Sequence, residues 1–185
     1  MPIFIICLSI GLIVFYDCNG KNNKLLVNID SGSIKDSIYS NDFLGWSIKI
    51  PSRFDTIPAT TREEIIKKIS KDNYDSNGTI KLLGIKKIDN KSTSLVSTLD
   101  IKSYYPDYTK PNDWYKVTED LLNKQLKSNG FTFDFKKSQT DINRITFYSA
   151  DITFFKESKK CYHQYMIFRF LKDYVLTITI GSDDD

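Results

Sequence analysis

The residue types that most often carry catalysis are scarce in this chain. His163 is its only histidine, and Cys161 lies two positions before it. On a β-strand, residues at i and i+2 share a face but lie about 6–7 Å apart, because each residue rises about 3.3 Å. This separation is too long for the hydrogen bond of a thiol–imidazole pair. We therefore interpret Cys161 as a half-buried residue and His163 as a surface residue.

A pair of carboxylates is the alternative source of catalysis. Asp107 and Asp113 lie close together in the sequence, and glycoside hydrolysis uses two acids at a suitable separation. The chain has no glycine-rich phosphate loop, nucleophile elbow, zinc-binding helix motif or paired-cysteine motif. We therefore expect no enzyme activity, no metal and no cofactor, and keep a carboxylate-dependent enzyme acting on a sugar as an alternative.

One loop has the composition of a binding surface. It contains Tyr104, Tyr105, Asp107 and Tyr108, and Tyr115 follows shortly after. Aromatic planes beside a carboxylate suit a peptide or the face of a sugar, and loops often carry function. We predict a ligand surface at these five residues. The alternative is that the rings attach the loop to the rest of the domain.

The composition of the chain predicts one folded domain. It has 185 residues, of which 41% are hydrophobic and 14% aromatic, enough to form a core. The net charge of +3 comes from 26 basic and 23 acidic residues, which form no basic stripe. Nucleic acid is therefore not an expected partner.

The N-terminal residues predict export. The segment from Ile3 to Tyr16 is apolar and uncharged, a length that suits a signal segment better than a membrane-spanning helix, which needs about 20 residues. Ending at Cys18, it resembles a bacterial lipoprotein signal, which implies cleavage and lipidation there. An uncleaved anchor and ordinary secretion are the alternatives. We predict a signal segment over 1–18, a flexible tether over 19–41 and one domain over 42–185.

The stretch from Gly45 to Pro51 predicts the first strand of the domain. Trp46, Ile48 and Ile50 alternate with polar residues, so that one face is buried. Pro51 cannot donate a ladder hydrogen bond and ends the strand. We expect Trp46 to anchor the core, with strands 131–135 and 174–180 as partners on its buried face.

Two helices and six further strands follow in the sequence pattern. A capping-box spacing at Thr61 predicts a helix over 61–71. Asn112 or Asp113 is expected to cap a second helix that carries Trp114 and ends near Gly130. The other predicted strands are 79–88, 94–102, 131–136, 142–155, 161–171 and 174–180. The expected fold is α+β, an antiparallel sheet of about six to seven strands flanked by two helices, after the export segment.

The order of these elements resembles the PsbP-like fold. The resemblance covers about Asn41 to Ile180 and depends mainly on Trp46 to Pro51 and on the helix that carries Trp114. Within that fold, the chain resembles small bacterial lipoproteins of unknown function. The resemblance implies a central antiparallel sheet and a binding or assembly role, and it implies no catalytic residues.

These observations favour a non-enzymatic binding or assembly domain of the cell envelope. Its expected partner is a protein or a small ligand, and the membrane is reached through the N-terminal anchor. An immunity or inhibitor lipoprotein is a further alternative, which a neighbouring toxin gene would support.

Overall fold

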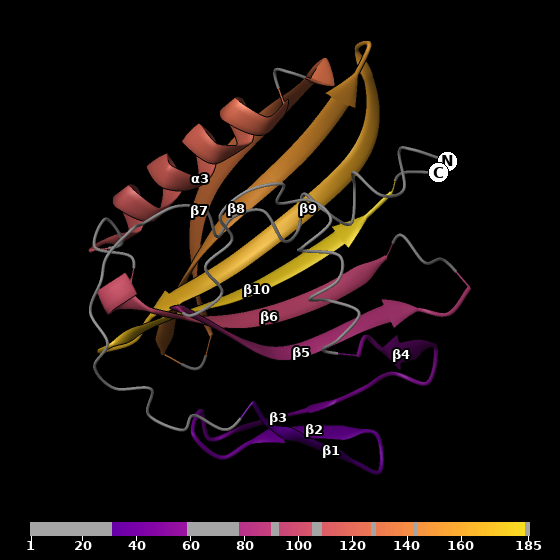
Figure 1. Ribbon diagram of the computed structural model, residues 1–185, viewed down its shortest axis with the longest axis vertical. Helices are drawn as coiled ribbons and strands as arrows, with labels where there is room; N and C mark the ends of the chain where they lie inside the picture. The colour runs from indigo at the N-terminus through magenta and orange to yellow at the C-terminus, as the bar shows by residue number, and fades with distance from the viewer. Residues whose placement is uncertain are drawn as a thin grey trace.

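The computed structural model describes residues 31–58, 78–89, 93–104, 109–126, 129–142 and 144–183. These residues form a seven-stranded antiparallel sheet, a three-stranded sheet and one α-helix (Figure 1). The large sheet has the strand order β4-β5-β6-β10-β9-β8-β7, and the small sheet has the order β1-β2-β3. The elements are β1 (Ser33–Lys35), β2 (Ile38–Asn41), β3 (Trp46–Lys49), β4 (Phe54–Thr56), β5 (Thr79–Lys87), β6 (Ser94–Ile101), the 3-10 helix η2 (Lys102–Tyr104), α3 (Pro111–Leu126), β7 (Phe131–Ile142), β8 (Ile145–Lys156), β9 (Lys159–Phe170) and β10 (Tyr174–Ser182).

The predicted helix that carries Trp114 is confirmed as α3. It begins at Pro111, earlier than the predicted cap at Asn112 or Asp113. Proline is favoured in the first turn because its fixed φ suits a helix and its missing N–H would have no helical partner there. Gly130 follows the helix with a φ of 71°, a left-handed conformation that glycine adopts without strain.

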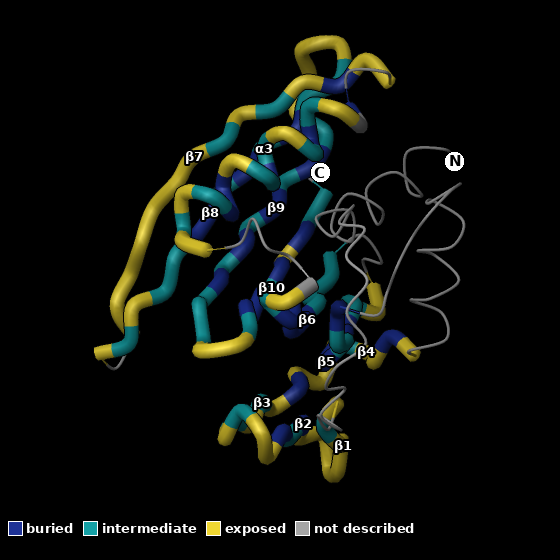
Figure 2. Tube along the Cα trace, turned by 60° about the vertical axis from the view of Figure 1, so that its left-hand side comes forward, coloured by how far each residue is buried: buried dark blue, intermediate teal, exposed yellow. Residues whose placement is uncertain are grey.

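The main hydrophobic core lies between α3 and the sheet. Trp114 is completely buried, and its ring stacks on Phe168 of β9 with 3.9 Å between ring centroids. Ile152, Phe154 and Met166 are also completely buried in this core. Figure 2 shows that β7, at the edge of the sheet, is mostly exposed, whereas β8 and β9 contain many buried residues. The helix thus covers one face of the sheet at its β7 end.

A second core joins the small sheet to the large one. Tyr39 and Ile50 are buried there with Leu99 and Leu176, and the half-buried Trp46 packs against them. The strand of Trp46 therefore lies in the small sheet. We expected the buried face of the Trp46 strand to be shared with β7. This prediction is wrong, because Phe131 of β7 packs in the other core, between α3 and the large sheet. Leu176 of β10 does contact the second core, as expected.

The predicted tether over 19–41 extends too far along the chain. Residues 33–41 form the β1–β2 hairpin, in which Tyr39 and Asn41 are 2% and 1% exposed. The turn is formed by Asp36 and Ser37, with φ of 51° and 60°. Such two-residue turns match the twist of the strands but usually contain Asn-Gly or Asp-Gly. The polar, glycine-poor turn explains why this hairpin was not predicted.

The other strand predictions are mostly confirmed, with two shifted boundaries. β5 and β6 pair as the predicted hairpin. β7 continues to Ile142, where the next strand was expected to start, and Arg144 has a φ of 64° in the turn before β8. Glu157 and Ser158 form a tight turn with positive φ before β9, shorter than the expected turn over 157–160. The turn at Arg144 was missed because it has positive φ without a glycine, whereas the turn at Glu157 and Ser158 was predicted and only its length differs.

The α+β fold class is confirmed in outline, but its expected layers differ. The large sheet gains its seventh strand from β4, and the strand of Trp46 belongs to a separate sheet. The described residues contain one α-helix, not two. The other predicted helix, over 61–71, lies outside the described residues.

The two cores lie on opposite faces of the large sheet. Val175 belongs to the core below α3, whereas the next residue, Leu176, belongs to the core with the small sheet. Neighbouring residues of a strand point to opposite faces. The helix therefore covers one face near β7, β8 and β9, and the small sheet covers the other face near β5, β6 and β10. The second face of β8 and β9 belongs to neither core.

Candidate functional site

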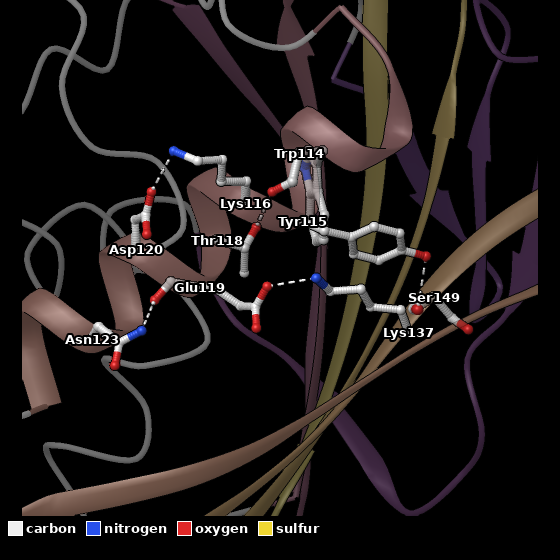
Figure 3. Close-up of polar contacts among 9 residues, drawn as sticks. All are labelled: Trp114, Tyr115, Lys116, Thr118, Glu119, Asp120, Asn123, Lys137 and Ser149. Atoms are coloured by element: carbon white, nitrogen blue, oxygen red, sulfur yellow. Dashed lines mark hydrogen bonds and ion pairs between the residues drawn. The ribbon is translucent and has the colours of Figure 1, made fainter.

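Tyr115, which was predicted to lie at a ligand surface, is a core residue. It is 5% exposed, and its hydroxyl donates toward the carbonyl oxygen of Ser138 at 2.9 Å. The same hydroxyl lies 3.0 Å from the carbonyl oxygen of Ser149 (Figure 3). Burial raises the pKa of this hydroxyl, although the hydrogen bond to Ser149 opposes the shift. Because its ring and hydroxyl already have partners, Tyr115 is not available to a ligand at the surface.

The rest of the predicted ligand surface is not placed by the structure. Tyr105, Asp107 and Tyr108 lie outside the described residues, and only the backbone of Tyr104 is described, in η2. The predicted lipidation site Cys18 also lies outside them. These residues stay predictions from the sequence.

Cys161 and His163 have separate partners. The Cys161 thiol donates to the carbonyl oxygen of Phe154 at 3.4 Å. His163 Nε2 lies 2.9 Å from Asp151 Oδ1, across the β8–β9 pair. The histidine therefore pairs with a carboxylate rather than with the thiol, as expected from their spacing along one strand.

The acidic residues within the described ranges form no metal site. Asp113 accepts a hydrogen bond from Thr109 at the start of α3. Within those ranges, no group of three or more histidine, cysteine or acidic side chains is arranged to hold a metal ion. Asp113 thus has a structural role at the helix start.

A large hollow does lie on the face of β8 and β9 that neither core covers. We call it the trough. Its volume is about 850 Å³, within the range of about 300–1,000 Å³ that is typical of small-molecule sites. Its lining residues come from the β2–β3 turn, the ends of β7 and β8, and the strands β9 and β10: Phe43, Leu44, Gly45, Trp46, Ile142, Ile145, Phe147, Ile167, Arg169, Leu171, Lys172, Asp173, Tyr174, Leu176 and Ile178.

The floor of the trough is mainly apolar. Phe147 of β8, Ile167 of β9 and Ile178 of β10 are all only half-buried. Ile167 and Ile178 are directly opposite each other in the β9–β10 pair, so both side chains are on the same face. An apolar ligand that covered this floor would remove these side chains from water, which is favourable by about 25 cal/mol per Å².

One wall of the trough is the turn between β2 and β3. Asn41 is buried, and its Oδ1 accepts a hydrogen bond of 2.8 Å from the Leu44 backbone N–H. Gly45 completes the turn with a φ of 63° and donates its N–H to Asp42 at 3.2 Å. This arrangement holds Phe43 edge-on to Tyr174, with ring centroids 5.3 Å apart. The wall is therefore fixed by a hydrogen-bonded turn.

Arg169 is the one cation within the apolar floor. It lies opposite Leu176 in the β9–β10 pair, and its guanidinium lies 5.9 Å from the centre of the Phe147 ring. Among the described residues, no carboxylate lies within ion-pair distance of it. Within the described ranges, the floor of the trough thus combines an apolar surface with one positive charge, that of Arg169, whereas Lys172 lies in the exposed turn before β10.

Sequence reasoning did not identify the trough. Its residues come from three separate parts of the chain, 43–46, 142–147 and 167–178. The β10 pattern of Tyr174, Leu176 and Ile178 was interpreted only as a buried face. One signal was present: β8 and β9 have apolar residues on both faces, such as Phe147 next to Tyr148 and Ile167 next to Phe168. In an antiparallel sheet, one face commonly contacts water and is polar. Apolar residues on both faces of such strands therefore indicate a second covered surface.

Comparison with known proteins supports the fold. No protein-family model matches the sequence, and no curated protein matches it significantly. The structure is similar to the solution structure of cyanobacterial PsbP (CyanoP) from Synechocystis sp. PCC 6803, with a TM-score of 0.56 and 9% sequence identity. The match covers 83% of this chain and 85% of that one. At this identity the similarity shows a PsbP-like fold and nothing about a shared ligand.

Within the described residues, no helix is both long enough and apolar enough to cross a membrane. The apolar segment from Ile3 to Tyr16 lies outside the described residues.

Proposed function

We propose that this protein is a non-enzymatic binding or assembly domain of the cell envelope that holds an apolar part of its ligand in the trough. The observation that carries the proposal is the open apolar floor formed by Phe147, Ile167 and Ile178. Small-ligand sites are typically concave and mostly apolar, with few polar groups that fix orientation. The trough has this character, and the PsbP-like sheet supplies its rigid floor.

The location in the cell envelope is supported by the sequence. The apolar segment from Ile3 to Tyr16 has the length of a signal segment. Lipidation at Cys18 would attach the domain to a membrane, while secretion or an uncleaved anchor would export the same domain without a lipid. In each case the trough would face an extracytoplasmic compartment.

We expect the neutral apolar dye Nile red to bind in the trough and to fluoresce more strongly there. Ile178→Asp places a charge in the floor and should reduce Nile red affinity by about tenfold or more, since covering a carboxylate with a neutral apolar dye costs well over 1.4 kcal/mol. Fluorescence titration measures the affinity. The matched control is Ile88→Asp, because Ile88 is 50% exposed and lies outside the trough.

The proposal requires the two variants to differ. Circular dichroism and thermal unfolding should first show that both remain folded. If wild-type protein does not bind the dye, or if Ile178→Asp and Ile88→Asp bind it equally well, the trough is not the binding site.

A further inference from the structure

The unpaired charge in the trough specifies the chemistry of its ligand, provided that the proposed function holds. We infer that the trough binds a long-chain alkyl carboxylate, with the carboxylate on the Arg169 guanidinium and the hydrocarbon chain on the apolar floor. Arg169 is half-buried between Leu176 and Phe147. A charged group in such surroundings is costly unless it has a partner. The ligand would supply that partner.

The geometry around Arg169 suits a carboxylate. The guanidinium is planar and weakly hydrated, and it stacks on aromatic rings, as its position 5.9 Å from the Phe147 ring centre allows. Its N–H groups form a fork that matches both oxygens of a carboxylate. Phe147 thus limits the movement of the guanidinium. The N–H groups of the guanidinium can still donate hydrogen bonds to an anion.

The other charged residues that line the trough do not form a second site for an anion. Lys172 and Asp173 are neighbours in the turn before β10, and both are exposed. Their opposite charges offset each other at a distance, and exposed charges are screened by water and salt. Arg169 therefore provides the net positive charge next to the apolar floor.

The backbone of the floor excludes the usual recognition of an extended peptide. A peptide that adds to a sheet needs a free strand edge with unpaired N–H and C=O groups. β8, β9 and β10 each have a hydrogen-bonded strand on both sides. Recognition on this floor must therefore use side chains, and these offer hydrocarbon surface and one cation.

The remaining lining residues suit an alkyl chain. Ile142, Ile145, Ile167 and Ile178 are aliphatic, and Ile142 is 48% exposed. Each CH₂ group transferred from water onto such a surface contributes about 0.8 kcal/mol when fully buried. The Ile142–Ile145 pair and the Ile167–Ile178 pair lie on opposite sides of Arg169 along the strands. A ligand with its carboxylate at Arg169 can therefore extend its chain over either pair.

Isothermal titration calorimetry with three ligands of equal chain length tests the inference. Hexadecanoate, hexadecanol and hexadecyltrimethylammonium are used below the concentrations at which they aggregate. We expect hexadecanoate to bind wild-type protein at least about tenfold more tightly than the other two, since hydrogen bonds to charged groups contribute about 1.5–3 kcal/mol. Arg169→Gln should remove this preference, so that hexadecanoate and hexadecanol bind the variant with affinities within about twofold of each other.

Two further variants make the result specific. Arg53→Gln removes an exposed arginine outside the trough and should leave hexadecanoate affinity unchanged. Arg169→Lys keeps the charge but loses the planar fork, so its affinity should lie between those of wild type and Arg169→Gln. If Arg169→Gln is misfolded by circular dichroism, this lysine variant provides the test.

The outcomes separate the inference from the proposed function. Wild-type protein that binds Nile red but shows no preference for hexadecanoate would overturn the inference and leave the proposed function standing. An Arg169→Gln or Arg169→Lys variant with wild-type preference would also overturn it. Failure of all four probes to bind wild-type protein would overturn both.

Discussion

Replacing Trp114 by alanine should lower the free energy of unfolding by about 3–5 kcal/mol, the usual range for large-to-small changes of aromatic core residues. Trp114 is completely buried in the core below α3, and it stacks on Phe168. The change removes a large apolar surface and leaves a cavity between helix and sheet. Urea unfolding followed by circular dichroism measures the loss.

Two controls separate the contribution of the ring from other effects. Trp114→Phe should cost much less than the alanine variant, because the indole N–H is buried without an acceptor and no hydrogen bond is lost. Phe43→Ala should cost less than about 1 kcal/mol, since Phe43 is 45% exposed. A loss below about 1 kcal/mol for Trp114→Ala would show that α3 does not pack on the sheet as described.

The second large effect concerns a buried carboxyl in β6. Asp100 is completely buried, and its Oδ1 accepts a hydrogen bond of 2.8 Å from Thr79, while its Oδ2 has no hydrogen-bond partner among the described residues. Burial raises the pKa of Asp100 well above its ordinary value, although the hydrogen bond from Thr79 opposes the shift. The folded protein therefore holds this proton more strongly than the unfolded chain does.

This difference in pKa between the folded and unfolded states makes the free energy of unfolding depend on pH. Because the pKa of Asp100 is higher in the folded state, its protonation stabilises the fold below the unfolded pKa, and this stabilisation is lost as the pH rises through the folded pKa. The side-chain amide of the Asp100→Asn variant cannot ionise. We therefore expect this variant to be more stable than wild type at neutral pH, and the gain should disappear as the pH falls toward the ordinary range of aspartate.

Unfolding by urea across a pH series measures this difference. Asp134→Asn is the control, since Asp134 is an exposed residue of β7, and its stability curve should remain parallel to that of wild type. Equal pH dependence for wild type and Asp100→Asn would contradict a buried, destabilised carboxylate at this position.

The sequence allowed the regular elements to be predicted where the hydrophobic period was long. The α3 helix was found because Trp114, Leu122 and Leu126 recur on one face, with a capping residue at Asn112 or Asp113 and Gly130 near its end. The β1–β2 hairpin was missed because its turn residues, Asp36 and Ser37, adopt positive φ without the glycine that usually marks such turns.

The candidate site was less predictable than the fold. Alternation along β10 shows that Leu176 and Ile178 share a face, but not which element covers each residue. In the structure, Leu176 packs in the core with the small sheet and also borders the trough, whereas Ile178 lines the trough without belonging to that core. The trough also depends on the β2–β3 turn, which was assigned to the start of the domain without a tertiary partner. Such a site arises only when distant segments assemble.

¹H–¹⁵N NMR spectra of labelled protein, recorded during titration with Nile red, show whether the trough binds the apolar part of a ligand. We expect the largest shifts in the backbone amides of Phe43–Trp46, Phe147, Ile167 and Ile178, with little change along the exposed side of α3. Shifts concentrated on α3 or on β1, with the trough residues unchanged, would contradict binding in the trough.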